Sequence, residues 1–295
     1  MKDGNTREIK YCIFDPTGNI TALVETGVEE ARQPEVASLI MDRHPDVEQV
    51  GFVRLEGRSG DSDVSLRMAG GEFCGNATMS AAALFALRNA QSGPGAGELR
   101  PEVRVKVSGA PEPLDVKLER KEGDSFFCGV KMPPAVSIDS IGFSMEGAEG
   151  ETLTGLPLIR MGGIDHIVID DDSFFFRLKE NKEIAEMFIK KWCALLDSDC
   201  LGIMFLEDGE IERMLTPLVY VPGADTIFWE NSCASGSAAV GMYLASEYNA
   251  PVDISLSEPA GILRVKSEPA GGETWLFGTA KPAGESIIKI DMDNI

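Results

Sequence analysis

The stretch GGEFCGNATMSAAALFAL, residues 70–87, decides the fold, because it places a cysteine between a glycine-rich loop and a run of small apolar residues. Such a run favours a helix, and the glycines around Cys74 mark where that helix begins. A second stretch, WENSCASGSAAVGMYLAS, residues 229–246, has the same design around Cys233. We therefore expect two helices of small residues, each with a cysteine at its N-terminus.

Runs typical of β-strands surround each of these helices in a similar order. Those around the first helix are residues 10–15, 20–25, 50–55, 64–68, 103–107, 114–119 and 126–132. Those around the second are residues 156–161, 166–170, 201–206, 214–221, 252–256, 261–266 and 273–278. Each half has one further expected helix. One follows Pro34, and the other covers residues 180–196, with an apolar face of Ile184, Met187, Phe188 and Leu195.

The stretch of residues 137–155 is rich in Gly, Ser and acidic side chains, and is expected to be the main linker. It divides the chain into a first domain over residues 1–136 and a second over residues 156–279. The similar order of elements on both sides predicts an α/β (α+β) protein built from two similar domains.

Charge and composition exclude several classes of function. Lys and Arg number 27 against 48 Asp and Glu, for a net charge of −21. Nucleic-acid binding and attachment to an anionic membrane both depend on basic clusters, so we expect neither. The N-terminal residues lack the apolar core of a signal peptide, and the apolar run of residues 81–87 is too short to cross a bilayer. We expect a cytoplasmic protein with a small-molecule partner.

Metal and disulfide sites are also not expected. The six cysteines include no CxxC pair, and the chain has only two histidines. For Cys12, Cys128, Cys193 and Cys200 we expect a buried structural role. His166, at the start of an expected strand, is interpreted as structural rather than as a catalytic base.

A cysteine at a helix N-terminus is suited to proton transfer. The free N–H groups there can bind a carboxylate and lower the pKa of the thiol. Two such helix starts facing each other would place one thiol on each side of the α-carbon of a bound amino acid. One thiolate would remove the α-proton and the other thiol would deliver a proton to the opposite face. This chemistry predicts an amino-acid racemase or epimerase that needs no cofactor, with Cys74 and Cys233 as its catalytic residues.

The chain resembles the diaminopimelate epimerase superfamily. Cys74-Gly75-Asn76 is similar to that family's Cys-Gly-Asn-Gly element, and Cys233-Ala234-Ser235-Gly236 to its Cys-Gly-Thr/Ser-Gly element. Further similarities cover most of the chain. Gly18-Asn19 is similar to the family's Gly-Asn-Asp-Phe segment. Glu48-Gln49 is similar to the end of its Gly-Xaa-Asp-Gln stretch, and residues 162–168 are similar to its Gly-Asn-Pro-His element.

The resemblance implies two domains, each a curved mixed sheet around a central helix, with the active site between them. It implies that the C-terminal segment, about residues 280–295, returns to the first domain. It further implies a set of substrate-binding residues, with the four near the cysteines acting through their backbone N–H groups. They are Asn19, Gln49, Gly75, Asn76, Ala234 and Ser235.

Departures from the family pattern bear on the substrate. The Arg that follows Cys-Gly-Asn-Gly is absent, and so is the Glu-Arg pair before the second cysteine. A distal carboxylate would therefore be poorly held, so we expect an α-amino acid other than diaminopimelate. Asp165, Asp225 and Glu230 are either contacts to a cationic substrate side chain or plain surface carboxylates, and the sequence leaves this open.

Two rival functions and the oligomeric state also stay open. One rival is a double-bond isomerase of a carboxylic acid on the same fold. The other is a relative that binds a small molecule without turnover. A homodimer is one arrangement that the sequence leaves open.

Overall fold

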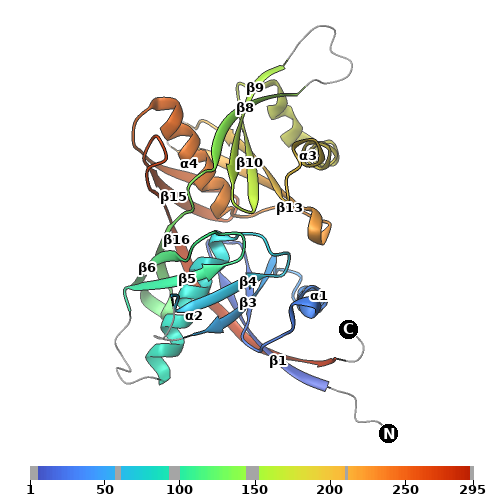
Figure 1. Ribbon diagram of the computed structural model, residues 1–295, viewed down its shortest axis with the longest axis vertical. Helices are drawn as coiled ribbons and strands as arrows, with labels where there is room; N and C mark the ends of the chain where they lie inside the picture. The colour runs from blue at the N-terminus through green and yellow to red at the C-terminus, as the bar shows by residue number, and fades with distance from the viewer. Residues whose placement is uncertain (1–5, 57–60, 93–99, 144–152, 210–211, 293–295) are drawn as a thin grey trace.

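The computed structural model describes residues 6–56, 61–92, 100–143, 153–209 and 212–292. Two lobes lie along its long axis, and strand β16 (Thr274–Asp291) runs from one lobe into the other (Figure 1). The other elements of the first lobe are β1 (Thr6–Asp15), β2 (Thr21–Val24), α1 (Gln33–Arg43), β3 (Gln49–Leu55), β4 (Val64–Met68), α2 (Gly75–Ser92), β5 (Glu102–Val107), β6 (Leu114–Arg120) and β7 (Phe126–Lys131). Those of the second lobe are β8 (Ser137–Phe143), β9 (Leu153–Met161), β10 (Ile164–Asp170), α3 (Lys182–Leu196), β11 (Leu201–Glu207), β12 (Arg213–Val221), β13 (Thr226–Trp229), α4 (Ala234–Tyr248), β14 (Val252–Glu258) and β15 (Gly261–Ser267).

The first lobe is a closed barrel. Its strands pair in the order β1 to β7 and then β16, and β16 pairs back onto β1. Two of these pairings, β2 with β3 and β4 with β5, are parallel, so the sheet is mixed. Closure leaves this sheet no free edge among the described residues. The expected fold class, a mixed sheet wrapped round a helix, is confirmed.

Helix α2 fills the barrel, and its composition explains why it can. It packs on the barrel strands from β2 to β7 and on β16, and its side chains are buried on all sides from Gly75 to Ala86. An eight-stranded barrel has an interior that side chains alone can fill. A helix fits inside only if its own side chains are small, as Ala77, Ala81 and Ala82 are. Enlarging Ala82 to Leu should cost about 1–3 kcal/mol through overpacking.

The second lobe is a sheet with helices on both faces. Its strands pair in the order β16, β15, β14, β12, β11, β10, β9 and β8, and β13 adds to β12. Both β10 and β11 are buried on both faces. On β11, Ile203 and Phe205 face the cluster under α3, while Met204 and Leu206 face the cluster around α4. Strands covered on both sides carry continuous apolar runs, as these do.

The predicted linker is wrong in part. Residues 137–143 form β8, which pairs antiparallel with β9. The rest of that stretch up to residue 152 lies outside the described residues. The composition suggested a loop, but β8 is an edge strand, where Ser and Asp side chains can face solvent. The lobes are joined instead by the short segment from Met132 to Val136 and, near the C-terminus, by β16.

The predicted apolar face of the second-lobe helix is also wrong. In α3 the buried side chains are Ala185, Ile189, Trp192 and Cys193. Ile184, Met187 and Leu195 are exposed instead. Trp192 decides the orientation, because its large ring packs edge-on against Phe175 in the core.

No helix within the described residues is long and apolar enough to cross a membrane.

Candidate active site

The N-termini of the two small-residue helices meet between the lobes. Cys74 directly precedes α2, and Cys233 is the N-cap residue of α4. A Cβ atom built on Gly75 would lie 2.8 Å from the Cβ atom of Ala234, closer than real Cβ atoms approach. The first residues of the two helices are therefore in contact, which requires glycine at position 75.

A cavity of about 510 Å³ lies at this contact. The predicted residues that line it are Gln49, Cys74, Gly75, Asn76, Cys233, Ala234 and Ser235. Asn19 does not line it, because its side chain is completely buried behind Gln49. The sequence-predicted residues are thus brought together, seven on the cavity wall and one behind it.

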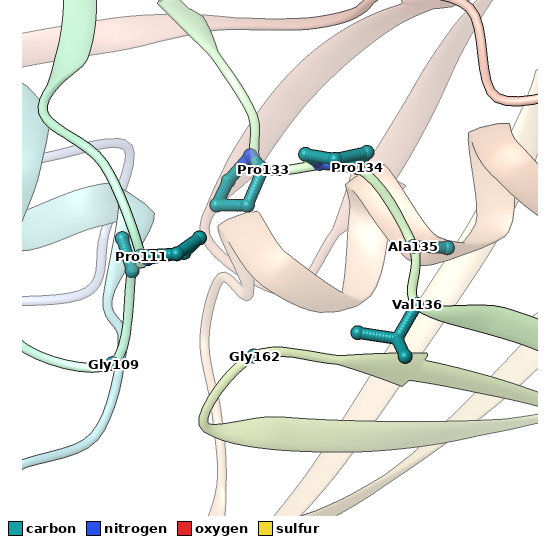
Figure 2. A pocket seen from close by; sticks show the side chains of 8 residues that line it. Gly109, Pro111, Pro133, Pro134, Ala135, Val136 and Gly162 are labelled. Carbon is teal, nitrogen blue, oxygen red and sulfur yellow. The ribbon is translucent and has the colours of Figure 1, made fainter.

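A second cavity, of about 440 Å³, lies at the connection between the lobes. Figure 2 shows Pro133, Pro134 and Val136 of the connecting segment on one side of it, with Pro111 and Gly162 facing them. Its described lining consists of glycine, alanine, valine and proline. These side chains offer neither proton transfer nor hydrogen bonds, so the first cavity is the candidate active site.

The Cys74 thiol donates a hydrogen bond to Gln49. The distance from Sγ to Oε1 is 2.7 Å, and the backbone N–H of Ala77 donates to the same sulfur at 3.3 Å. Burial raises the pKa of the Cys74 thiol above its usual range, and Glu230 and Glu72 raise it further. The free protein therefore holds Cys74 mainly as a thiol.

Cys233 is surrounded by carboxylates. Its backbone N–H donates to Oε2 of Glu258 at 2.6 Å, and the hydroxyl of Ser237 donates to the other oxygen of the same carboxylate. The thiol itself lies 3.7 Å from the hydroxyl of Ser235, and the nearby Glu230 carboxylate acts on it electrostatically. Burial raises the pKa of Cys233, and both carboxylates add to that rise. Burial also raises the pKa of Glu230 and of Glu258 to about 8 in each case.

The cavity wall is acidic. Glu48, Glu72 and Glu230 all line it, and none of its described lining residues is Lys, Arg or His. Burial raises the pKa of Glu48 and that of Glu72. The Oε2 atom of Glu72 is buried without a hydrogen-bond partner, and so is Oδ1 of Asn76. These unpaired acceptors suit a ligand that brings N–H donors.

Of the three acidic residues that the sequence left open, only Glu230 lines the cavity. Asp165 bonds to Arg160 and to Ser198 away from it. Asp225 is exposed and pairs with Lys190. The position of Glu230, three residues before Cys233, was a signal available in the sequence, as was that of Glu72 before Cys74. Glu258 carried no such signal.

The remaining cysteines and His166 match their predicted structural roles. Cys12, Cys128, Cys193 and Cys200 are free and buried, and none of them lines the cavity. His166 is fully buried on β10, where burial lowers the pKa of its imidazole to about 3. It is therefore neutral. The described residues contain no cluster of three or more His, Cys, Asp or Glu able to hold a metal ion.

Comparisons with known proteins indicate the family. The family described as the histidine racemase CntK N-terminal domain matches residues 8–275. The chain is 32% identical over 255 residues to a histidine racemase of Fusobacterium nucleatum, covering 84% of this chain and 85% of that protein. It is 27% identical over 296 residues to a histidine racemase of Staphylococcus aureus, covering 97% and 100%.

A solved structure shares the fold at lower identity. It is a hydroxyproline epimerase from Agrobacterium vitis, with a TM-score of 0.69 and 12% sequence identity, covering 97% of this chain and 93% of that one. At this identity the likeness supports the fold, which is that of the expected superfamily.

Proposed function

The chain belongs to the histidine racemase family, and from that premise we propose that it interconverts the enantiomers of histidine, using Cys74 and Cys233 as a paired acid and base. That it is an isomerase acting at the α-carbon of an amino acid follows from the family. The observation that carries the rest of the proposal is the contact between Gly75 and Ala234, which brings one thiol from each lobe to a single cavity.

The substrate carboxylate would bind to backbone N–H groups at the two helix starts. The first N–H groups of a helix have no partner within the helix, and the helix dipole adds partial positive charge there. Gly75 and Asn76 supply such groups from α2, and Ala234 and Ser235 from α4. The described lining has no cationic side chain that would compete for the carboxylate. These dipoles would also stabilise the negative charge that develops when the α-proton leaves.

Each inversion of the α-carbon would involve two proton transfers. One sulfur, as the thiolate, takes the α-proton and becomes a thiol, and the electron pair stays on the carbon next to the carboxylate. The other sulfur, as a thiol, gives its proton to the opposite face and becomes a thiolate. Glu230, which lines the same cavity and acts on the Cys233 thiol, would accept that thiol's proton and so generate the first thiolate.

The acidic wall supports a substrate with an N–H-rich side chain. Glu48 and Glu72 offer carboxylates to an imidazole or imidazolium ring, and the unpaired Oδ1 of Asn76 offers an acceptor for the ammonium group. A second carboxylate on the substrate would be repelled here. This agrees with the expectation that diaminopimelate is not the substrate.

The presence of both cysteines on the cavity favours the racemase over the two rivals. A double-bond isomerase or a binding protein has no need of two thiols on one cavity.

The test is incubation of the purified protein with L-histidine or D-histidine in deuterated water, followed by chiral chromatography and mass analysis. We expect each enantiomer to yield the other with one deuterium at the α-carbon, converging on equal amounts. Proline, lysine and meso-diaminopimelate, assayed in parallel, should react at least about a hundredfold more slowly. Absence of α-deuterium in histidine, with the protein folded, would contradict the proposal.

A further inference from the structure

A chain of side-chain amides connects Cys74 to the residue before Cys233. The Cys74 thiol donates to Oε1 of Gln49 at 2.7 Å, and Nε2 of Gln49 donates to Oδ1 of Asn19. Nδ2 of Asn19 in turn donates to the backbone carbonyl of Ser232 at 2.9 Å. Asn19 and Ser232 are both fully buried, while the half-buried Gln49 lines the cavity, so the Asn19 end of this series of amides is shielded from bulk water.

The Ser232 carbonyl fixes which atom donates and which accepts in every hydrogen bond of this series of amides. A backbone carbonyl only accepts hydrogen bonds, so the NH₂ group of Asn19 must point toward Ser232. The same NH₂ group lies 3.3 Å from Oε2 of Glu48, a second acceptor. The carbonyl of Asn19 must then face Gln49, which has to offer its NH₂ group there. The carbonyl of Gln49 is consequently the atom that faces Cys74.

A carbonyl oxygen 2.7 Å from a sulfur stabilises the thiol and opposes the thiolate. If the Gln49 amide were flipped, its carbonyl would face the carbonyl of Asn19. If both amides were flipped, the carbonyl of Asn19 would face that of Ser232. The cost of an unpaired buried acceptor, about 1–3 kcal/mol, holds the orientation.

We infer that Asn19 and Gln49 are positioning residues that hold Cys74 as the proton-donating thiol of the free enzyme, which leaves Cys233 to act as the base. The inference rests on the proposed racemase function for the roles of acid and base, while the polarity of the amide chain stands on geometry alone.

The two cysteines differ in what can receive their protons. Next to Cys74 are an amide carbonyl and the backbone N–H of Ala77, neither of which takes up a proton. Around Cys233 are two carboxylates, which can: Glu258, bonded to the Cys233 backbone N–H at 2.6 Å, and Glu230 on the cavity wall. The charged groups that act on Cys74 from neighbouring segments, Glu72 and Glu230, are both acidic and also favour its thiol form.

The proton balance follows from this asymmetry. Cys233, once its proton has passed to Glu230, takes the α-proton, and Cys74 gives its own proton to the opposite face. Cys74 is then a thiolate facing the Gln49 carbonyl. It regains a proton in one of two ways. It takes the α-proton of the opposite enantiomer while Cys233 gives its own, or it takes a proton from water while Glu230 releases its proton, and the second route restores the starting state.

The test measures the reactivity of Cys74 in the free enzyme, so it needs no turnover. Wild-type protein and variants are treated briefly with iodoacetamide between pH 6 and 10. Peptide mass analysis then gives the alkylated fraction at Cys74. Gln49→Met removes the facing carbonyl and should raise the alkylation rate at pH 8 about tenfold. Gln49→Glu, of nearly the same shape, puts a carboxylate there and should lower the rate about tenfold.

A matched control is Gln33→Met. Gln33 is a buried glutamine on α1 that bonds to Val28 and Arg67, and it does not line the cavity. This variant should leave the Cys74 profile unchanged. Opposite shifts in the two Gln49 variants support the inference, because loosened packing alone would increase reactivity in both.

Alkylation of Cys74 that is unchanged or slower in Gln49→Met overturns the inference, as does faster alkylation in Gln49→Glu. Racemisation by the wild-type protein, measured separately, would survive that result. The reverse result, opposite shifts without any racemisation, overturns the proposed function and leaves the polarity of the amide chain in place.

Discussion

Gly75 and Ala234 are in contact across the two lobes, since a Cβ atom built on Gly75 would lie 2.8 Å from that of Ala234. Each residue is the first of its helix, and each follows a cysteine. A carboxylate bound by both helix N-termini must therefore lie at this contact, with the sulfurs of Cys74 and Cys233 nearby.

Because of this contact, a methyl group added at position 75 should lower both activity and stability. Gly75→Ala should separate the two helix starts and lower kcat/KM about a hundredfold, because small displacements of reacting groups have effects of that size. Stability should fall by about 1–3 kcal/mol through overpacking. Steady-state kinetics and urea unfolding measure the two effects. Gly27→Ala is the control, as the space around Gly27 is open. Wild-type kcat/KM in Gly75→Ala would show that the contact is not needed.

Replacing Glu230 should slow proton transfer. Its carboxylate lines the cavity beside Cys233 and acts on that thiol, and Gln cannot accept the thiol's proton. Glu230→Gln should lower kcat about a hundredfold or more. The ionised form is the active one, so wild-type activity should rise with pH through the Glu230 pKa of about 8, and the variant should lack that rise. The control is Glu102→Gln on the exposed surface of β5. An unaltered pH profile in Glu230→Gln would exclude this role.

The buried carboxyl of Glu258 should make the free energy of unfolding depend on pH. Burial raises the pKa of its carboxyl to about 8, from about 4.5 in an unfolded chain. Between these values the folded state binds more protons than the unfolded state, so the free energy of unfolding falls as pH rises from about 4.5 to about 8. Glu258→Gln keeps the shape and removes the titration. The slope in that interval should become less negative by up to about 1.4 kcal/mol per pH unit.

Urea unfolding of both proteins at several pH values from 5 to 8 measures that slope. Because Glu230 also has a pKa of about 8, the variant should keep part of the dependence. Identical slopes in the two proteins would mean that Glu258 does not titrate in this range.

Local patterns in the sequence predicted most of the fold. The small-residue runs after Cys74 and Cys233 form α2 and α4, because a helix buried on all sides must be narrow. The strands around them alternate apolar and polar residues or are apolar throughout. Wrong predictions arose where composition and burial disagree. Acidic and small residues in β8 suggested a linker, and α3 buries Trp192 rather than the more regular stripe through Met187.

Sequence motifs predicted Asn19, Gln49 and the residues beside the two cysteines, but not the contacts that join distant segments. Glu258 reaches Cys233 from a strand 25 residues later, and Asn19 bonds to a carbonyl 213 residues away. No local periodicity encodes such contacts, because they depend on how β14 and the loop after β1 pack against α4. Only part of the acidic wall carried a local signal, since Glu72 and Glu230 lie two and three residues before a cysteine.

The most direct test of the two-thiol mechanism is α-proton exchange and inversion of L-histidine and D-histidine in deuterated water by the wild-type protein, Cys74→Ser and Cys233→Ser. Cys193→Ser is the control, since the Cys193 thiol bonds to a backbone carbonyl away from the cavity and serine can keep that bond. We predict that the control racemises histidine as the wild type does. Each of the other two variants should stay folded and lose racemisation about a thousandfold or more. Racemisation at the wild-type rate by Cys74→Ser or by Cys233→Ser would contradict the mechanism.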